Sequence, residues 1–183
     1  MIRHKLQTAI DKRASLLGAG TDALRLIDGE GDSLPGLYLD TLAGRWLVST
    51  TASELDTEVL TWLQGQGDQG RTIYWKQLDQ HEKTNPTHIA GPRQDEAFTI
   101  KESGVDYLLD FQSGYSQGIF LDQRLNRQRV RAHSKDGTTV LNTFAYTGAF
   151  SVCAALAGAT TTTLDLSQVY LDWARNHFLA NDI

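Results

Sequence analysis

Two short segments near the end of the chain carry residue types that could bind a nucleoside. The segment from Ala145 to Phe150 is expected to join a strand to a helix, and Gly148 within it lets the backbone approach a ligand closely. Thr147 offers a hydroxyl group at the start of that helix. One strand later, Asp165 places a carboxylate that can accept hydrogen bonds from both hydroxyls of a ribose. The pair predicts a nucleotide or nucleoside site.

The glycine pattern narrows the class of ligand. There is no second glycine two residues from Gly148 and no phosphate-binding lysine beside it. A pyrophosphate needs closely spaced glycines, so a nicotinamide oxidoreductase is disfavoured and an uncharged nucleoside-type ligand is favoured. Asp165 is hard to explain as structure, because a lone acid between apolar residues gains little at a strand end. Phe144 and Phe150 also fit as plain core residues.

The elements around these residues predict the beginning of a parallel α/β sheet. Residues 140–146 are typical of a buried strand, 148–159 of a helix of small residues, 161–167 of a second strand and 168–182 of an amphipathic helix. Strand, helix, strand, helix with short connections is the pattern of such a sheet. The only cysteine, Cys153, falls within the first of these helices and is expected to be a buried structural thiol.

The first half of the chain predicts a smaller antiparallel domain. A helix is expected over residues 2–17, and a second helix is expected to be capped by Thr51 or Ser53, to end near residue 63 and to be stopped by the glycine-rich stretch that follows. The expected strands cover residues 24–28, 34–40, 45–51 and 71–78, of which the first three form an antiparallel meander.

The middle of the chain predicts a loop, a hairpin and a basic helix. Residues 79–94 are polar and lack a hydrophobic period, so they are expected to be a loop or mobile linker. A hairpin is expected around Ser103 and Gly104, and a helix over residues 119–134. We therefore expect an N-terminal helix (1–20), a small central α/β domain (21–94) and the first part of a larger domain (95–183).

Charge and composition limit the partners. The chain has 22 acidic and 17 basic residues, a formal charge of -5, which argues against a grip on nucleic acid by the whole surface. A local basic stripe is either an RNA contact or a solvated helix face; it comprises Arg124, Arg127, Arg129, Arg131, His133 and Lys135. A single cysteine excludes an internal disulfide and a cysteine-cluster metal site, and no metal site is expected.

The sequence carries no signal for a membrane. Charges interrupt every apolar stretch of residues 1–17, and no run approaches the roughly 20 apolar residues of a membrane span. We therefore expect a soluble, cytoplasmic protein.

Three stretches, in order, resemble one enzyme family. Residues 141–159 and 164–182 resemble the first cofactor motifs of class I S-adenosylmethionine methyltransferases, and are most similar to the family that makes 5-methylcytosine in large-subunit ribosomal RNA. Residues 118–131 resemble the family's stretch leading into the methyltransferase sheet, and residues 29–48 the opening of its small central domain. The resemblance implies an α/β fold, with a small antiparallel α+β domain followed by the start of a Rossmann-like sheet.

The resemblance also implies S-adenosylmethionine as the cofactor and assigns residues to it. The residues that would line its methionine and sulfonium side are Phe144, Tyr146, Thr147, Gly148 and Phe150. Asp165 would bind the ribose hydroxyls, and Leu166 and Ser167 would lie beside the adenine. Gln123 and Arg124 match positions near the cofactor and the sheet edge, although Arg124 equally suits pairing with a nearby acid or a helix end.

The chain departs from the family's pattern at both ends. The family's RNA-binding β-barrel is expected to be absent or reduced to the helix over residues 2–17, and only two of seven sheet strands are expected, so no catalytic residue can be named. The expected function is methyl transfer to carbon 5 of a ribosomal RNA cytosine by a protein of which this is a fragment with half the cofactor site, inactive alone. The alternative is a truncated, inactive homologue that binds RNA or protein. A sheet that ends after two strands also predicts self-association.

Overall fold

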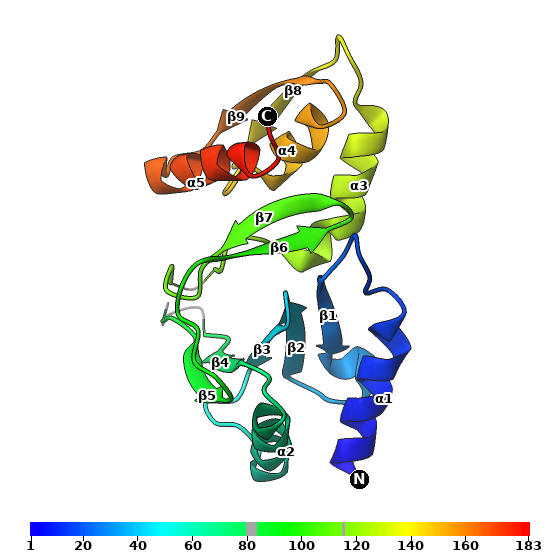
Figure 1. Ribbon diagram of the computed structural model, residues 1–183, viewed down its shortest axis with the longest axis vertical. Coiled ribbons are helices and arrows are strands. Elements are labelled where there is room, and N and C mark those ends of the chain that lie inside the picture. Colours follow the sequence, from blue (N-terminus) through cyan, green and yellow to red (C-terminus); the bar gives the residue numbers. More distant parts are fainter. Residues whose placement is uncertain (80–83, 115) are drawn as a thin grey trace. The chain divides into compact units, whose positions relative to one another are not determined.

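The computed structural model describes residues 1–79, 84–114 and 116–183 (Figure 1). The chain forms two compact units. The first unit holds residues 1–97 and 110–117, and the second holds residues 98–109 and 118–183. The N-terminal segment predicted as a separate element (1–20) falls within the first unit, and the short segment 110–117 returns to that unit.

A five-stranded sheet forms the centre of the first unit. Its strand order is β1-β2-β3-β4-β5, and the antiparallel meander predicted for the first three strands is confirmed. β4 runs parallel to β3, and β5 runs antiparallel to β4. The strands are β1 (Ala23–Asp28), β2 (Leu37–Leu42), β3 (Arg45–Thr50), β4 (Ile73–Gln77) and β5 (Thr87–Ala90), with the 3-10 turn η1 (Gly29–Asp32) after β1.

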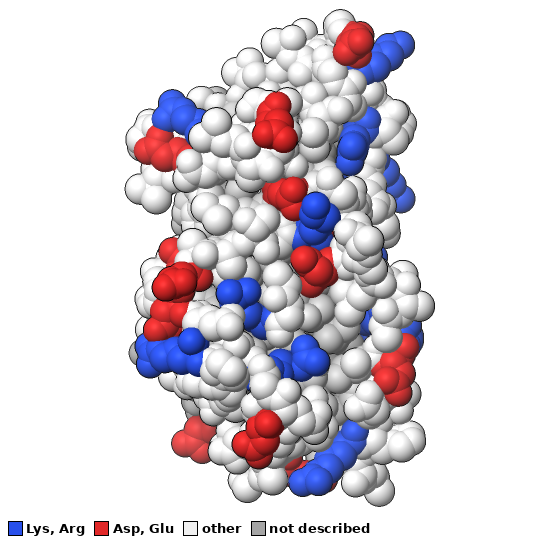
Figure 2. Space-filling view, viewed as in Figure 1, with Lys and Arg blue, Asp and Glu red and all other residues white. Residues whose placement is uncertain are grey.

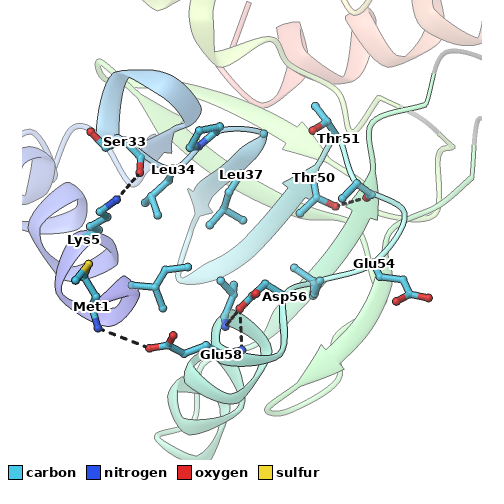
Figure 3. Close-up of a pocket in the computed structure, with 16 residues that line it drawn as sticks. Met1, Lys5, Ser33, Leu34, Leu37, Thr50, Thr51, Glu54, Asp56 and Glu58 are labelled. Atoms are coloured by element: carbon cyan, nitrogen blue, oxygen red, sulfur yellow. Dashed lines mark hydrogen bonds and ion pairs between the residues drawn. The ribbon is translucent and has the colours of Figure 1, made fainter.

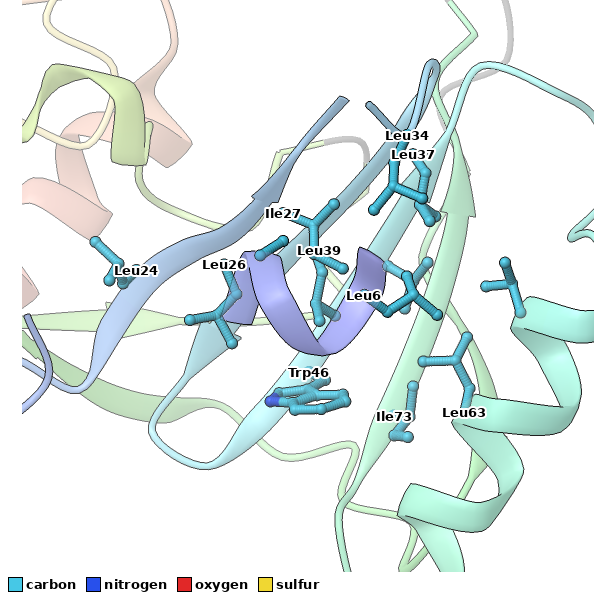
Figure 4. Close-up of a cluster of buried hydrophobic side chains, with 13 residues drawn as sticks. Leu6, Leu24, Leu26, Ile27, Leu34, Leu37, Leu39, Trp46, Leu63 and Ile73 are labelled. Carbon is cyan, nitrogen blue, oxygen red and sulfur yellow. The ribbon is translucent and has the colours of Figure 1, made fainter. Parts of the chain in front are cut away.

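Two helices pack on this sheet and complete its core. α1 (Ile2–Ala14) contributes Leu6, and α2 (Thr57–Asp68) contributes Leu63; each is 1% exposed. Figure 4 shows these side chains among leucine, isoleucine and tryptophan residues of the strands. At about 25 cal/mol per Å² of apolar surface removed from water, this cluster supplies the main stabilisation of the first unit.

α2 begins and ends later than predicted. It starts after Asp56, whose Oδ1 accepts hydrogen bonds from the backbone amides of Glu58 (2.8 Å) and Val59 (3.2 Å), so the prediction of Thr51 or Ser53 as cap is wrong. The helix continues into the glycine-rich stretch that was expected to stop it and ends there at Asp68. A Cβ at Gly67 would lie 2.6 Å from Cβ of Ala90, so this glycine lets α2 approach β5 closely.

The prediction of a loop throughout residues 79–94 is wrong, because β5 lies within it. β5 has only partly buried and exposed side chains, and its strand structure comes from pairing with β4, where Tyr74 lies opposite His88. Because none of its side chains is fully buried, no hydrophobic period marks the strand. Residues 80–83 of the predicted loop lie outside the described residues, as does residue 115 of the later loop at 113–118.

The second unit combines a hairpin with a two-stranded parallel sheet. The hairpin predicted around Ser103 and Gly104 is confirmed, and both residues have the positive φ that the turn requires. The elements of the second unit, in chain order, are β6 (Phe98–Glu102), β7 (Val105–Leu109), the 3-10 turn η2 (Leu121–Gln123), α3 (Arg124–His133), β8 (Thr139–Thr143), α4 (Ala149–Ala155), β9 (Thr160–Leu164) and α5 (Gln168–Leu179). β8 pairs with β9 in parallel, as predicted.

α5 and the residues after it fasten the hairpin. Trp173 Nε1 donates a hydrogen bond to the carbonyl of Leu108 (2.9 Å). The amide side chain of Asn181 donates to the carbonyl of Asp106 (2.7 Å) and accepts from its backbone N–H (2.9 Å). The edge of β7 is therefore covered by α5 rather than by another strand.

One face of the β8–β9 sheet is exposed. Leu141 on β8 is 65% exposed and Leu164 on β9 is 57% exposed. The prediction of a buried strand over residues 140–146 is therefore wrong on two counts, since β8 ends at Thr143 and its side chains are alternately exposed and only partly buried. The opposite face is covered by α4, whose small side chains allow a close approach.

Candidate functional site

The turn after β8 has an unusual backbone. Phe144 (φ 54°), Tyr146 (φ 51°) and Gly148 (φ 71°) alternate in the left-handed region. Non-glycine residues held there cost about 1–3 kcal/mol each, and such strain clusters at functional sites. Gly148 is required for a second reason, because a Cβ would lie 2.8 Å from Cβ of Ala174 on α5.

Asp165 joins this turn to the turn after β9. Its Oδ2 accepts a hydrogen bond from the backbone N–H of Tyr146 (2.8 Å), and its Oδ1 accepts from the N–H of Ser167 (2.9 Å). The structure thus brings together the two segments that the sequence singled out. It also gives the carboxylate a structural role that the sequence did not reveal. Each carboxylate oxygen has a second lone pair and can still accept a hydrogen bond from a ligand.

The hydroxyls of Tyr146 and Thr147 are engaged within the protein. Tyr146 Oη accepts a hydrogen bond from the backbone N–H of Gly118 (2.9 Å), and Thr147 Oγ1 donates to the carbonyl of Gly118 (2.6 Å). Thr147 is completely buried. The expected hydroxyl at the helix start is thus present, but it binds the loop before η2, and α4 has Gly148 as a cap without a side-chain hydrogen bond.

The apolar side chains expected around a cofactor differ in exposure. Phe144 is 88% exposed and Leu166 is fully exposed, so both lie open beside Asp165. Phe150 is partly buried, with its ring centre 6.0 Å from the guanidinium carbon of Arg127. Ser167 caps α5 by accepting a hydrogen bond from the backbone N–H of Tyr170 (3.4 Å).

Gln123 and Arg124 lie where η2 meets α3. Gln123 donates to Asp122 (2.6 Å) and accepts from Asn126 (2.9 Å). Arg124 is partly buried and makes no ion pair within 4.0 Å of its nitrogens in the described part of the chain, so pairing with Asp122 is not seen. Its charge is therefore available to a ligand.

The arginine stripe is divided by the packing of α3. Arg127 is 2% exposed and forms two hydrogen bonds of 2.8 Å to the Glu102 carboxylate, which removes it from any RNA-binding face. Arg131, one turn later, donates weakly to the carbonyl of Ser103 (3.4 Å). On the molecular face shown in Figure 2, basic and acidic side chains are interspersed rather than gathered by sign.

Two buried groups near the turn have shifted pKa values. Burial raises the pKa of the Cys153 thiol, whose Sγ lies 3.1 Å from Tyr107 Oη, so the expected buried, inert thiol is found. Burial also lowers the pKa of His177, whose ring nitrogens lie 2.9 Å from the carbonyl oxygen of Thr147 and 3.0 Å from that of Leu108. The sequence did not predict a role in the site for His177 or Gly118. For Gly118, the only sequence feature was its position directly before the apolar residues 119 and 120.

A cavity of about 480 Å³ lies in the first unit, and none of its lining residues belongs to this turn (Figure 3). Leu34, Leu37 and Val59 line its apolar part. Its charged lining groups have both signs, so no ligand charge is favoured; they are Met1, Lys5, Glu54, Asp56 and Glu58. Among the described residues, no group of three metal-ligating side chains is present, and no membrane-crossing helix is found.

Comparison with known proteins decides the family. The model of the S-adenosylmethionine-dependent methyltransferase family matches residues 51–182. The chain belongs to this family. YwbD of Bacillus subtilis, provisionally named as a ribosomal RNA large subunit methyltransferase, is 36% identical over 98% of this chain and 47% of its own length. Ribosomal RNA large subunit methyltransferase I of Alteromonas mediterranea is 33% identical over 97% of this chain and 47% of its own length.

Solved structures of methyltransferases share the fold. The crystal structure of SMU.776 in complex with SAH matches with a TM-score of 0.87 and 33% identity over 98% of this chain and 48% of that chain. The chain therefore has the α/β fold expected from its sequence. It spans about half the length of the curated relatives it matches.

The residues after β8 and β9 fit the family's cofactor. An adenosine presents ribose hydroxyls and an apolar ring face. Asp165 offers free lone pairs for the hydroxyls, and the exposed side chains of Phe144 and Leu166 offer apolar surface beside it. Gly148 is buried and lets the turn pack closely against Ala174 of α5.

Proposed function

We propose that this chain carries the adenosine-binding part of a methyltransferase that modifies large-subunit ribosomal RNA. The observation that carries the proposal is the position of Asp165, which is held by backbone amides of both strand-end turns. A carboxylate held in this way is preorganised, so a ribose meets it without loss of side-chain freedom. Relatives named as ribosomal RNA methyltransferases support the substrate class.

The proposed contacts follow from exposure and position. Asp165 binds the ribose hydroxyls, Leu166 contacts the adenine, and Ser167 orients the following helix by capping it. Phe144 and the backbone around Gly148 meet the methionine side, with Phe150 packed behind them. S-Adenosylmethionine supplies the methyl group when bound.

The segment at η2 completes the proposed site. We propose that Gln123 and Arg124, where η2 meets α3, lie beside the turn, and the cationic Arg124 suits a carboxylate such as that of a methionine moiety. We infer carbon 5 of a cytosine as the position methylated, on the resemblance of residues 141–182 to the 5-methylcytosine family. A target base within an RNA duplex has to be extruded before it can reach the cofactor.

Calorimetric titration with S-adenosylhomocysteine tests the proposal. We expect binding by the wild-type chain and a loss of at least roughly tenfold in affinity for Asp165→Ala, since one charged hydrogen bond contributes about 1.5–3 kcal/mol. Asp172→Ala is the matched control, because Asp172 is exposed on α5 and pairs only with neighbours on that helix. The absence of binding by the wild-type chain at millimolar ligand would overturn the proposal.

The exposed sheet face favours a second candidate function, a binding module without catalysis. Leu141 and Leu164 on neighbouring strands expose apolar surface that monomeric proteins usually cover. We propose that the chain self-associates through this face. A wild-type chain that binds RNA or protein partners but no S-adenosylhomocysteine would favour this function over the first.

A further inference from the structure

Gly118 is fixed at both of its polar backbone atoms by two consecutive residues of the turn after β8. Its N–H donates to Tyr146 Oη at 2.9 Å, and its carbonyl accepts from Thr147 Oγ1 at 2.6 Å. The two contacts span 28 and 29 residues, so they join segments that are distant in sequence. Both hydroxyl oxygens therefore take part in contacts within the protein.

Backbone conformation and packing allow only glycine at residue 118. Gly118 has φ 117°, a conformation that L side chains rarely adopt. A Cβ there would lie 2.6 Å from the Trp173 ring and 2.9 Å from the carbonyl oxygen of Leu108. Only glycine therefore fits between α5 and β7 while presenting both polar atoms to the turn.

The position of Gly118 in the chain gives these contacts a consequence for the site. Three residues after it, η2 begins, and η2 leads directly into Arg124 at the start of α3. Arg127 also donates to the carbonyl of Phe120 (3.0 Å), so the connection is short and held at both ends. Movement of Gly118 relative to the turn would move Gln123 and Arg124 with it.

We propose that Tyr146 and Thr147 are positioning residues that hold the segment with Gln123 and Arg124 against the cofactor turn through Gly118. We call these three residues the Gly118 clamp: Gly118, Tyr146 and Thr147. This inference rests on the proposed function for its ligand, and it replaces direct contact of the Tyr146 and Thr147 side chains with the cofactor by a role one step removed. The ligand then meets the backbone of the turn, while the hydroxyls determine where the neighbouring segment lies.

Substitutions that remove only hydroxyls test the clamp. Tyr146→Phe removes the acceptor for the Gly118 N–H, and Thr147→Val removes the donor to its carbonyl. We expect each to weaken S-adenosylhomocysteine binding by about tenfold, the value of one to two hydrogen bonds. Thr147→Ser keeps the hydroxyl and is expected to restore affinity to within about twofold of wild type, which a purely steric role of the threonine methyl would not allow.

Tyr170→Phe is the matched control for Tyr146→Phe. The Tyr170 ring packs edge-on against Tyr146, with centroids 4.6 Å apart, and its hydroxyl has no hydrogen bond among the described residues. We expect affinity unchanged within about twofold. Equal losses in the Tyr146 and Tyr170 variants would overturn the clamp, because they would show a general effect of the aromatic cluster.

The Gly118 amide supplies a readout that needs no ligand. In ¹⁵N-labelled free protein, its hydrogen exchange is expected to be slow and to accelerate at least tenfold in Tyr146→Phe but not in Tyr170→Phe. If wild type fails to bind S-adenosylhomocysteine while this protection is present, the proposed function fails and the contact stands. If wild type binds and the Tyr146→Phe and Thr147→Val variants bind equally well, the positioning role is wrong.

Discussion

The two units of the chain bury their apolar residues to different extents. In the first unit, α1, α2 and five strands enclose a continuous cluster that includes Leu6, Leu63 and Ile73. In the second, Leu141 and Leu164 remain more than half exposed, and Phe144 and Leu166 still more so. The candidate site lies in the unit with the less complete core. A ligand or a further layer of structure binds at exposed strand ends. The first unit therefore supplies stability, whereas the second unit supplies a binding surface.

The largest effect on stability is expected when the buried ion pair of the second unit is broken. Arg127→Ala leaves the Glu102 carboxylate buried without its partner, and we expect a loss of about 3–5 kcal/mol in the unfolding free energy of that unit. Hydrogen exchange resolved by residue measures it. Arg129→Ala, at an exposed position on the same helix, is expected to change stability by less than about 0.5 kcal/mol. An equal loss of protection in the first unit would show that the units unfold together.

A core substitution in the first unit is the reciprocal test. Leu63→Ala removes a side chain that is 1% exposed and leaves a cavity, with an expected loss of about 2–5 kcal/mol. Urea unfolding followed by exchange at β1 to β4 measures it, and Leu16→Ala, at a half-exposed position, is the control. Retained stability in the Leu63 variant would contradict the assignment of the stabilising core to this cluster.

The pH dependence of the first unit gives a smaller effect. Burial lowers the pKa of Lys76 to about 8, from 10.5 in an exposed lysine, despite the opposing charge of Asp40. Between these values the unfolded chain binds more protons than the folded one, so stability rises as pH increases through this window. At about 1.4 kcal/mol per pKa unit, the gain is roughly 3 kcal/mol at most. Unfolding from pH 7 to 10.5 is expected to show this rise in wild type and to lose it in Lys76→Met.

The smallest change in stability is expected at the exposed face. Leu141→Lys with Leu164→Lys places charge on side chains that already contact water, so the free energy of unfolding should change by less than about 1 kcal/mol. Association should change much more, because the apolar contact is lost. Sedimentation velocity is expected to show concentration-dependent dimers for wild type and monomers for the double variant; a wild-type chain that stays monomeric at high concentration contradicts the proposed self-association.

Local patterns predicted the elements whose stability is local. The meander of β1 to β3 and the β6–β7 hairpin carry their own alternation and turn residues, and the parallel β8–β9 pair follows from the order strand, helix, strand, helix. The start of α2 was missed because Asp56 was a competing cap among several polar residues. Its end was missed because Gly67 serves packing against Ala90, which no local rule shows.

The site was predicted in part for the same reason. Gly148 and Asp165 follow strand ends, where sequence position alone indicates proximity, and the hydrogen bond from Tyr146 to Asp165 joins the two turns. Gly118 lies between residues that the sequence placed in a loop and a helix, and its partners are 28 and 29 residues away. Contacts of that range depend on the whole unit.

The hydrogen bonds between β7 and Asn181, which follows α5, have a consequence for folding during translation. A hairpin closes in about 1–10 μs once its strands exist. The backbone N–H of Asp106, however, donates a hydrogen bond to Asn181, which lies 75 residues later. A ribosome that adds about 5–20 residues per second supplies Asn181 only after roughly 4–15 s. During that interval the outer edge of β7 has no partner from α5. A nascent chain therefore exposes an unpaired strand edge for seconds, and we expect chaperone binding to this edge to be strongest during that time.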